Sequence, residues 1–158
     1  MAGSNRRGRG GGAGGLPNAT IKITIGSDLA ASRDVQRRIL EHVARYKFNH
    51  QCTFAIKLAL EEGLNNAIRH GNRLDPSKKV HVEARVTATE VEIVIEDEGS
   101  GFDRGVIPDP TLAENLEKTS GRGILLIEAY MNEVKWSRGG RRLRMIKRNE
   151  ADCPETCP

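Results

Sequence analysis

Two glutamates and two asparagines in the stretch LEEGLNNAIRHGN, residues 60–72, have the types and the spacing to do chemistry. In a helix, the four-residue spacing places Glu61 beside Asn65 and Glu62 beside Asn66. An amide oxygen is a good neutral ligand for Mg²⁺, and a carboxylate one helical turn away can act as a general base or hold a water molecule. For this helix alone, a solvated polar edge is the simpler interpretation.

A helical projection at about 100° per residue separates the two pairs. Glu61 and Asn65 fall among apolar side chains, at Phe54, Leu58, Leu64 and Ile68. Glu62 and Asn66 share their sector with small or polar side chains, at Ala55, Ala59 and His70, and such a wall leaves room for a ligand. The projection therefore favours Glu62 and Asn66 as the site pair. His70 is interpreted as a helix-end residue that interacts with the helix dipole.

A third carboxylate ends the strand predicted over residues 89–97. The inward-facing positions of that strand are aliphatic, and Asp97 is the next position in the same alternation. A core-facing carboxylate needs a partner, and Gly99 and Gly101, which follow at once, let the backbone approach a ligand closely. Asp97 is therefore suited to accept a hydrogen bond from an amino group such as that of adenine. A tight turn capped by aspartate is the alternative that D-x-G-x-G alone leaves open.

A glycine-rich segment, SGRG at residues 120–123, leads into a helix predicted over residues 124–132. The free N–H groups and the positive dipole end at a helix start favour anions. Further donors for phosphate oxygens stand at Lys118, Thr119, Ser120 and Arg122. The segment matches neither the Walker A loop nor the dinucleotide fingerprint, and a flexible linker with a glycine cap is the alternative. The long unpatterned connection between Phe102 and Gly121 is predicted to be a flap over a ligand.

Alternating strands and amphipathic helices must position these groups. Because every predicted strand alternates, each has one buried and one polar face, which excludes a doubly wound sheet covered on both sides. The sequence predicts an α/β (α+β) two-layer sandwich, with a mixed sheet of about five strands and three main helices on one face. The predicted strands cover residues 20–26, 80–88, 89–97, 133–136 and 141–148, and the predicted helices cover 27–48, 51–71 and 124–132.

The composition fits one domain. The chain has 158 residues, of which 37% are hydrophobic, and its net charge of +4 is concentrated near the two ends. Residues 1–18, rich in Gly and Arg, and residues 150–158 are predicted to be disordered tails around a folded domain at 19–149. Three cysteines, no apolar leader and no membrane-length run favour a cytoplasmic protein. Cys153 and Cys157 have no nearby ligand pair for zinc, and neither nucleic acid nor a membrane is expected as a partner.

The three motifs together are more specific than any one of them. E-x-x-x-N on a helix, D-x-G-x-G-F after a strand and G-x-G before a helix, in this order, resemble the ATP-binding domain of the GHKL (histidine kinase-like) superfamily. The runs EEGLNNAIRHGN and VEIVIEDEGSGFD are most similar to the RsbW-like anti-sigma factor serine/threonine kinases of bacteria. The resemblance covers about residues 19–148 and implies the Bergerat ATP-binding fold, with ATP and Mg²⁺ as cofactors.

The resemblance also implies a role for each matched residue. Glu62 falls on the position of the general base, Asn66 on that of the Mg²⁺ ligand, and Asp97 on that of the adenine-binding aspartate. The segment at 121–123 falls on the phosphate-binding motif. The predicted nucleotide-binding set is Asn66, Asp97, Gly99, Gly101, Phe102, Lys118, Thr119, Ser120, Gly121, Arg122 and Gly123.

For the function, the resemblance implies phosphorylation of a serine or threonine on a STAS-domain antagonist protein, partner switching with a sigma factor, and a homodimer. The alternative is an ATP-gated protein-binding module of the same fold without kinase activity, because the same residues would serve both. A detached histidine-kinase catalytic domain fits less well, since the sequence has no phosphoacceptor helix or dimerisation hairpin. An RNA-binding protein acting through the Gly/Arg tail lacks any RNA-binding fold signature.

Overall fold

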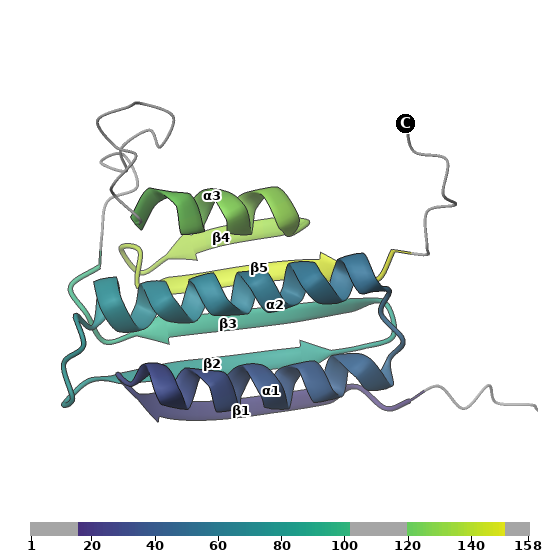
Figure 1. Cartoon of the computed structure of the whole chain (residues 1–158), viewed down its shortest axis with the longest axis horizontal. Coiled ribbons are helices and arrows are strands. Elements are labelled where there is room, and N and C mark those ends of the chain that lie inside the picture. The colour runs from purple at the N-terminus through teal and green to yellow at the C-terminus, as the bar shows by residue number, and fades with distance from the viewer. Residues whose placement is uncertain (1–15, 102–119, 151–158) are drawn as a thin grey trace, which may run out of the picture.

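The computed structural model of the chain describes residues 16–101 and 120–150 (Figure 1). All eight predicted elements are present in the predicted order, with ends within a few residues of the expected ones. The elements are β1 (Ala19–Gly26), α1 (Leu29–Arg45), α2 (His50–Asn65), η1 (Asn66–Gly71), β2 (Lys79–Val86), β3 (Glu90–Asp97), α3 (Ser120–Tyr130), β4 (Glu133–Ser137) and β5 (Arg142–Arg148). None of the described helices is long and apolar enough to cross a membrane.

Two helix ends differ from the prediction in a way that matters for the site. The second predicted helix ends as an α-helix at Asn65 and continues through the π-helical segment η1 to Gly71. The third helix, α3, begins at Ser120, so the SGRG segment forms its first turn instead of preceding it. Both differences fall at motifs singled out in the sequence.

The five strands form one sheet in the order β1-β2-β3-β5-β4, and all four pairings are antiparallel. The α/β two-layer class is confirmed, but the prediction of a mixed sheet was wrong. The reason is the number of elements between paired strands. Two helices separate β1 from β2, and α3 with β4 separates β3 from β5, so the chain enters each partner strand in the opposite direction. A parallel pair needs a single crossover.

The three helices cover one face of the sheet (Figure 1). The first begins where the carboxylate of Asp28 accepts a hydrogen bond from the Ala30 N–H at 2.9 Å, and the second where the Asn49 side chain accepts one from the Cys52 N–H at 2.7 Å. Between the layers lies an aliphatic core, whose largest fully buried members include Ile39, Ile56, Leu60, Leu64, Ile93, Ile95, Ile127, Leu143 and Met145. The burial of alternate strand residues confirms that the sheet is apolar on one face only.

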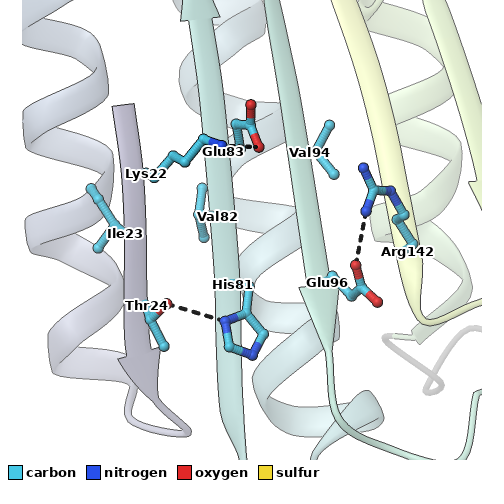
Figure 2. A pocket seen from close by; sticks show the side chains of 9 residues that line it. All are labelled: Lys22, Ile23, Thr24, His81, Val82, Glu83, Val94, Glu96 and Arg142. Atoms are coloured by element: carbon cyan, nitrogen blue, oxygen red, sulfur yellow. Dashed lines mark hydrogen bonds and ion pairs between the residues drawn. The ribbon is translucent and has the colours of Figure 1, made fainter. Parts of the chain in front are cut away.

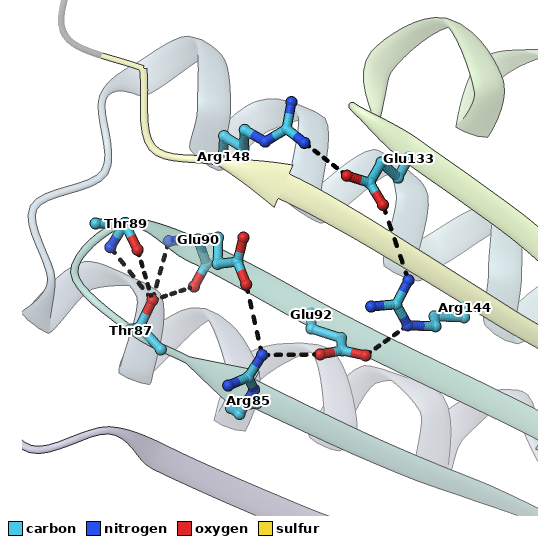
Figure 3. Close-up of polar contacts among 8 residues, drawn as sticks. All are labelled: Arg85, Thr87, Thr89, Glu90, Glu92, Glu133, Arg144 and Arg148. Atoms are coloured by element: carbon cyan, nitrogen blue, oxygen red, sulfur yellow. Dashed lines mark hydrogen bonds and ion pairs between the residues drawn. The ribbon is translucent and has the colours of Figure 1, made fainter.

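The opposite face of the sheet is covered by ion pairs. Figure 2 shows the part near β1, and Figure 3 shows the part near β5, where Arg144 lies between Glu92 and Glu133. Glu92 also pairs with Arg85 at 3.1 Å. Exposed pairs of this kind add little stability one by one, but they satisfy the charge on this face.

Asn72, the residue after η1, joins three loops through its side chain, which is fully buried. Its amide nitrogen donates to the Ser27 hydroxyl at 3.0 Å and to the Lys79 carbonyl at 2.8 Å, and its oxygen accepts from the Glu98 N–H at 2.8 Å. The three partners lie before α1, at the start of β2 and after β3. Asn72 therefore fixes the end of η1 against the loop that follows Asp97.

We predict that Asn72→Ala lowers the free energy of unfolding by about 2–4 kcal/mol, because three polar groups lose their partner and each buried unsatisfied group costs about 1–3 kcal/mol. Urea denaturation measures the change. Asn149→Ala is the matched control, since that side chain donates a single hydrogen bond, to the Ala88 carbonyl at 3.1 Å. Equal losses in the two variants would contradict the joining role of Asn72.

Candidate functional site

The carboxylate of Asp97 lies at the end of β3, and the residue is only 7% exposed. Its Oδ1 accepts a hydrogen bond from the Gly99 N–H at 2.8 Å, whereas its Oδ2 has no donor among residues 16–101 and 120–150. Burial raises the pKa of Asp97, and the Gly99 N–H and the Arg141 guanidinium partly offset that rise. The carboxylate therefore has a free acceptor, which fits an amino donor supplied by a ligand.

Glycines surround this carboxylate because side chains would not fit. A Cβ at Gly71 would lie 2.3 Å from Cγ of Asp97, and a Cβ at Gly99 would lie 2.0 Å from the Gly71 carbonyl oxygen. Gly101 has a φ of +82°, which favours glycine, and a Cβ there would lie 2.1 Å from the Gly139 carbonyl oxygen. The loop at 98–101 is thus in backbone contact with η1 on one side and with the β4–β5 turn on the other.

The carboxylate of Glu62 lies against the first turn of α3. A Cβ at Gly123 would lie 2.3 Å from Oε2 of Glu62, so the carboxylate rests directly on the α3 backbone. The pKa of Glu62 is raised, first because burial removes water from the carboxylate and second because the Glu61 charge is near. Glu61 itself is exposed. The glutamate of the helix motif and the second glycine of SGRG are thereby brought together, as a shared site requires.

Asn66 stands where α2 changes to η1. Its backbone N–H bonds to the carbonyls of Glu62 and Gly63, and its side-chain nitrogen is buried with no hydrogen-bond partner among the described residues. Rotation of the amide exchanges its nitrogen and oxygen, so this unpaired end fits a ligand such as Mg²⁺, which binds oxygen. No cluster of three or more His, Cys, Asp or Glu side chains that could hold a metal occurs in the described part of the chain.

The π-helical turn also changes where the following residues point. The helical projection at 100° per residue places His70 in one sector with Glu62 and Asn66, but the residue lies within η1, where that spacing does not apply, and it is exposed. π-Helical turns occur frequently at functional sites. The structure thus gives no support for His70 as a ligand, in line with its interpretation as a helix-end residue.

The remaining predicted residues are only partly described. Ser120 and Gly121 form the start of α3, and the Arg122 side chain is exposed. Phe102, Lys118 and Thr119, together with the predicted flap, lie outside the described residues. Sequence reasoning missed Asn72, Gly139 and Arg141, which border the site; the glycine pair in SRGG is the one signal that could have indicated a close backbone contact.

A depression of about 200 Å³ on the outer face of the sheet is a separate feature (Figure 2). Its charged side chains already have partners, because Lys22 pairs with Glu83 and Arg142 pairs with Glu96. Asp97 belongs to the opposite, helix-covered face, as the alternation along β3 requires. The outer depression is therefore not part of the candidate site.

Comparison with known proteins shows which family the chain is similar to. The family model described as histidine kinase-like ATPase domain matches residues 25–147. The serine/threonine-protein kinase BtrW of Bordetella bronchiseptica is 29% identical over 63% of this chain and 72% of its own length. The serine-protein kinase RsbW of Oceanobacillus iheyensis is 32% identical over 64% of this chain and 68% of its own length. An anti-sigma F factor from the same organism is 37% identical over 51% of this chain and 56% of its own length.

Among solved structures, the RsbU and RsbW domains of a Mycobacterium tuberculosis protein match with a TM-score of 0.56 and 20% identity. The match covers 84% of this chain and 32% of the other. At that identity the likeness shows the fold alone. The chain spans only about half of the anti-sigma F factors that it matches, 56% in the case given above.

We predict that Gly99→Ala disrupts the site, because the added Cβ would lie 2.0 Å from the carbonyl oxygen of Gly71 and one of the two backbones must move. The free energy of unfolding should fall by about 1–3 kcal/mol, as overpacking usually costs, and binding of a nucleotide should weaken. Thermal denaturation and calorimetry measure the two effects. Gly26→Ala is the control, since a Cβ there has no atom within 4 Å. If both variants behave like the unchanged protein, the close approach is not a constraint.

Proposed function

The chain belongs to the histidine kinase-like ATPase domain family, and on that premise we propose that it is an ATP-dependent serine/threonine protein kinase. The observation that carries the proposal is the contact between Glu62 and the start of α3. It joins the helix motif to the phosphate motif, while Asp97 lies at the other end of the same helix-covered layer, beside Gly71.

Asp97 would bind the adenine. Its unpaired Oδ2 is available to accept a hydrogen bond from the exocyclic amine, while Oδ1 is held by the Gly99 N–H. Gly99 and Gly101 keep side chains out of the loop around that position. The arrangement accepts an amino group and disfavours a carbonyl in the same place, so it selects adenine over guanine at this edge of the base.

The phosphates would lie at the start of α3. The N–H groups of its first turn are not used within the helix and are available to an anion, and Arg122 adds a positive charge there. Asn66 would hold Mg²⁺ through its side-chain oxygen, with phosphate oxygens and water completing the coordination. When bound, Mg²⁺ supplies neutralisation of the negative charge on the phosphates.

Glu62 would receive the proton of the acceptor hydroxyl. Its carboxylate lies against Gly123, next to the proposed phosphate position. The raised pKa makes its carboxylate a stronger base than that of an exposed glutamate. In the transfer, the acceptor oxygen bonds to the γ-phosphorus, the bond from that phosphorus to the β–γ bridging oxygen breaks, ADP leaves, and the hydroxyl proton moves to Glu62. The enzyme's contribution is mainly position and charge.

We further propose that the acceptor is a STAS-domain protein and that the chain switches between it and a sigma factor. The support is the similarity to proteins named anti-sigma F factor and serine-protein kinase RsbW. A homodimer and a cytoplasmic location belong to the same proposal. An ATP-gated binding module without phosphoryl transfer would use the same nucleotide site, and the second of the two experiments below separates the two functions.

We predict that Asp97→Asn weakens ATP binding by about 100-fold or more, because the adenine amine loses its charged acceptor and faces an amide that presents a donor. Isothermal titration calorimetry measures the affinity. Burial raises the pKa of Asp97, so its ionised form disfavours folding above its ordinary titration range, and the variant should not be less stable without nucleotide. Glu98→Gln removes an exposed neighbouring charge and should bind ATP normally. Unchanged affinity in Asp97→Asn would remove the adenine assignment.

We predict that Glu62→Gln retains ATP binding but transfers the γ-phosphate of labelled ATP to a STAS-domain protein at least about 100-fold more slowly. In the unchanged protein, the rate should fall as pH drops through the raised pKa of Glu62, because protonation removes the base. Glu61→Gln is the matched control: it should keep the rate and move that acid limb to lower pH, since the Glu61 charge raises the pKa of Glu62.

One outcome of this experiment would contradict the role of Glu62, and another would contradict kinase activity itself. Equal transfer rates in Glu62→Gln and Glu61→Gln would exclude Glu62 as the base. ATP-dependent binding of the STAS-domain protein without any label transfer, in the unchanged protein, would establish the ATP-gated binding module instead.

A further inference from the structure

The β4–β5 turn, residues 138–141, lies against Asp97 and the loop that follows it. The Asp97 N–H donates to the Arg141 carbonyl at 3.1 Å, so the turn is hydrogen-bonded to the residue that carries the carboxylate. The Gly139 carbonyl oxygen would lie 2.1 Å from a Cβ at Gly101. Three residues of the turn have positive φ, namely Arg138, Gly139 and Gly140, and this tight backbone lets the turn approach the loop closely.

Arg141 differs from the other arginines of this region. On the outer face, Arg142 pairs with Glu96 (Figure 2), and Arg144 and Arg148 pair with Glu92 and Glu133 (Figure 3). Arg138 also pairs with Glu96. Within the described ranges 16–101 and 120–150, Arg141 makes no ion pair. Its Nε donates to the Arg138 carbonyl at 3.3 Å, and its Cγ lies 3.5 Å from where a Cβ of Gly101 would be.

We propose that Arg141 is a positioning residue for Asp97, supplying the positive charge that keeps this buried, base-binding carboxylate ionised. The proposal rests on the function proposed above, because it concerns the same nucleotide site. Arg141 need not touch the nucleotide: it acts through Asp97. Arg141 stands opposite Asp97 at the end of the β3–β5 ladder, one position beyond the pair Glu96–Arg142, and the Asp97 N–H donates to its carbonyl. Opposite residues of antiparallel strands leave the same face of the sheet, so the Arg141 side chain starts on the helix-covered face with Asp97. The paired arginines of β5 lie on the outer face instead.

The charge state of Asp97 matters for recognition. With Oδ1 held by the Gly99 N–H, an ionised Asp97 presents Oδ2 as an acceptor to the adenine amine, whereas a proton on Oδ2 would set an O–H donor against an N–H donor. Burial is the largest cause that raises the pKa of Asp97, and Glu96 on the same strand adds to it. Three groups lower the pKa of Asp97: the Gly99 N–H has the largest effect, Arg141 the next largest and Lys78 the smallest. Among side chains, Arg141 therefore makes the largest contribution that opposes the effect of burial on the pKa of Asp97.

The test uses the full chain with two neutral variants, Arg141→Gln and Arg141→Met, and with Arg141→Lys, which keeps the charge. Arg144→Gln is the matched control, because it removes one positive charge from the adjoining strand β5, where Arg144 pairs with Glu92 on the outer face. The Arg141 side chain is partly exposed, so the variants are expected to fold, and thermal denaturation checks this before any titration.

The first readout is the ¹³C NMR titration of the Asp97 carboxyl without nucleotide. Its midpoint should move to higher pH in both neutral variants and stay near that of the unchanged protein in Arg141→Lys and Arg144→Gln. A purely structural role would not produce rescue by lysine alone. An unmoved midpoint in Arg141→Gln and Arg141→Met, or an equal shift in Arg144→Gln, would overturn the proposal.

The second readout is ATP affinity as a function of pH. The neutral variants should bind severalfold more weakly at the acid end of the profile and approach the unchanged protein as pH rises, because Asp97 then ionises without help. These two readouts distinguish a failure of the Arg141 proposal from a failure of the nucleotide-site proposal. A shifted NMR midpoint in a chain that binds no ATP would uphold the role of Arg141 toward Asp97 and refute the nucleotide site. An unshifted midpoint in a chain that binds ATP would do the reverse.

Discussion

The buried carboxylate of Asp97 is the constraint on which the rest of the site depends. A carboxylate at the end of a core strand is costly without compensation, and each neighbouring feature supplies part of it. Gly99 donates its N–H, and Gly71 and Gly99 lack the side chains that would displace the carboxylate. Asn72 then holds the end of η1 against the same loop through the Glu98 N–H. The glycine loop is therefore a consequence of placing a charge inside the sheet–helix interface.

The α2–η1 helix transmits that arrangement to the other half of the site. Gly71 at its end lies against Asp97, and Glu62 in its last α-helical turns lies against Gly123 of α3. Asn66 stands between them, at the change from α to π geometry, with an unpaired side-chain nitrogen. A straight α-helix would rotate Gly71 relative to Glu62. The change to π geometry at Asn66 thus sets the direction from which Gly71 meets the strand loop while Glu62 contacts α3.

Local patterns in the sequence predicted the parts of the site that repeat with a period. The two-residue alternation of β3 placed Asp97 on the buried face, and the helical projection chose Glu62 over the exposed Glu61. The features that local sequence patterns could not predict depend on contacts between segments that are far apart in the chain. Asn72 bonds to residues before α1 and after β3, and Arg141 approaches Asp97 only because β5 pairs with β3. The mixed sheet was a wrong prediction for the same reason, since strand direction depends on how many elements intervene.

The two carboxylates of the proposed site, buried Asp97 and partly buried Glu62, differ in what surrounds them, and the difference matches the roles proposed for them. Burial raises the pKa of both Asp97 and Glu62. At Asp97, an N–H and a guanidinium oppose the effect, which suits a group that must stay ionised as an acceptor. At Glu62, the second contribution comes from the Glu61 carboxylate and acts in the same direction, which suits a group that must take up a proton. One fold thus holds two carboxylates in one layer and assigns them opposite proton chemistry through their neighbours.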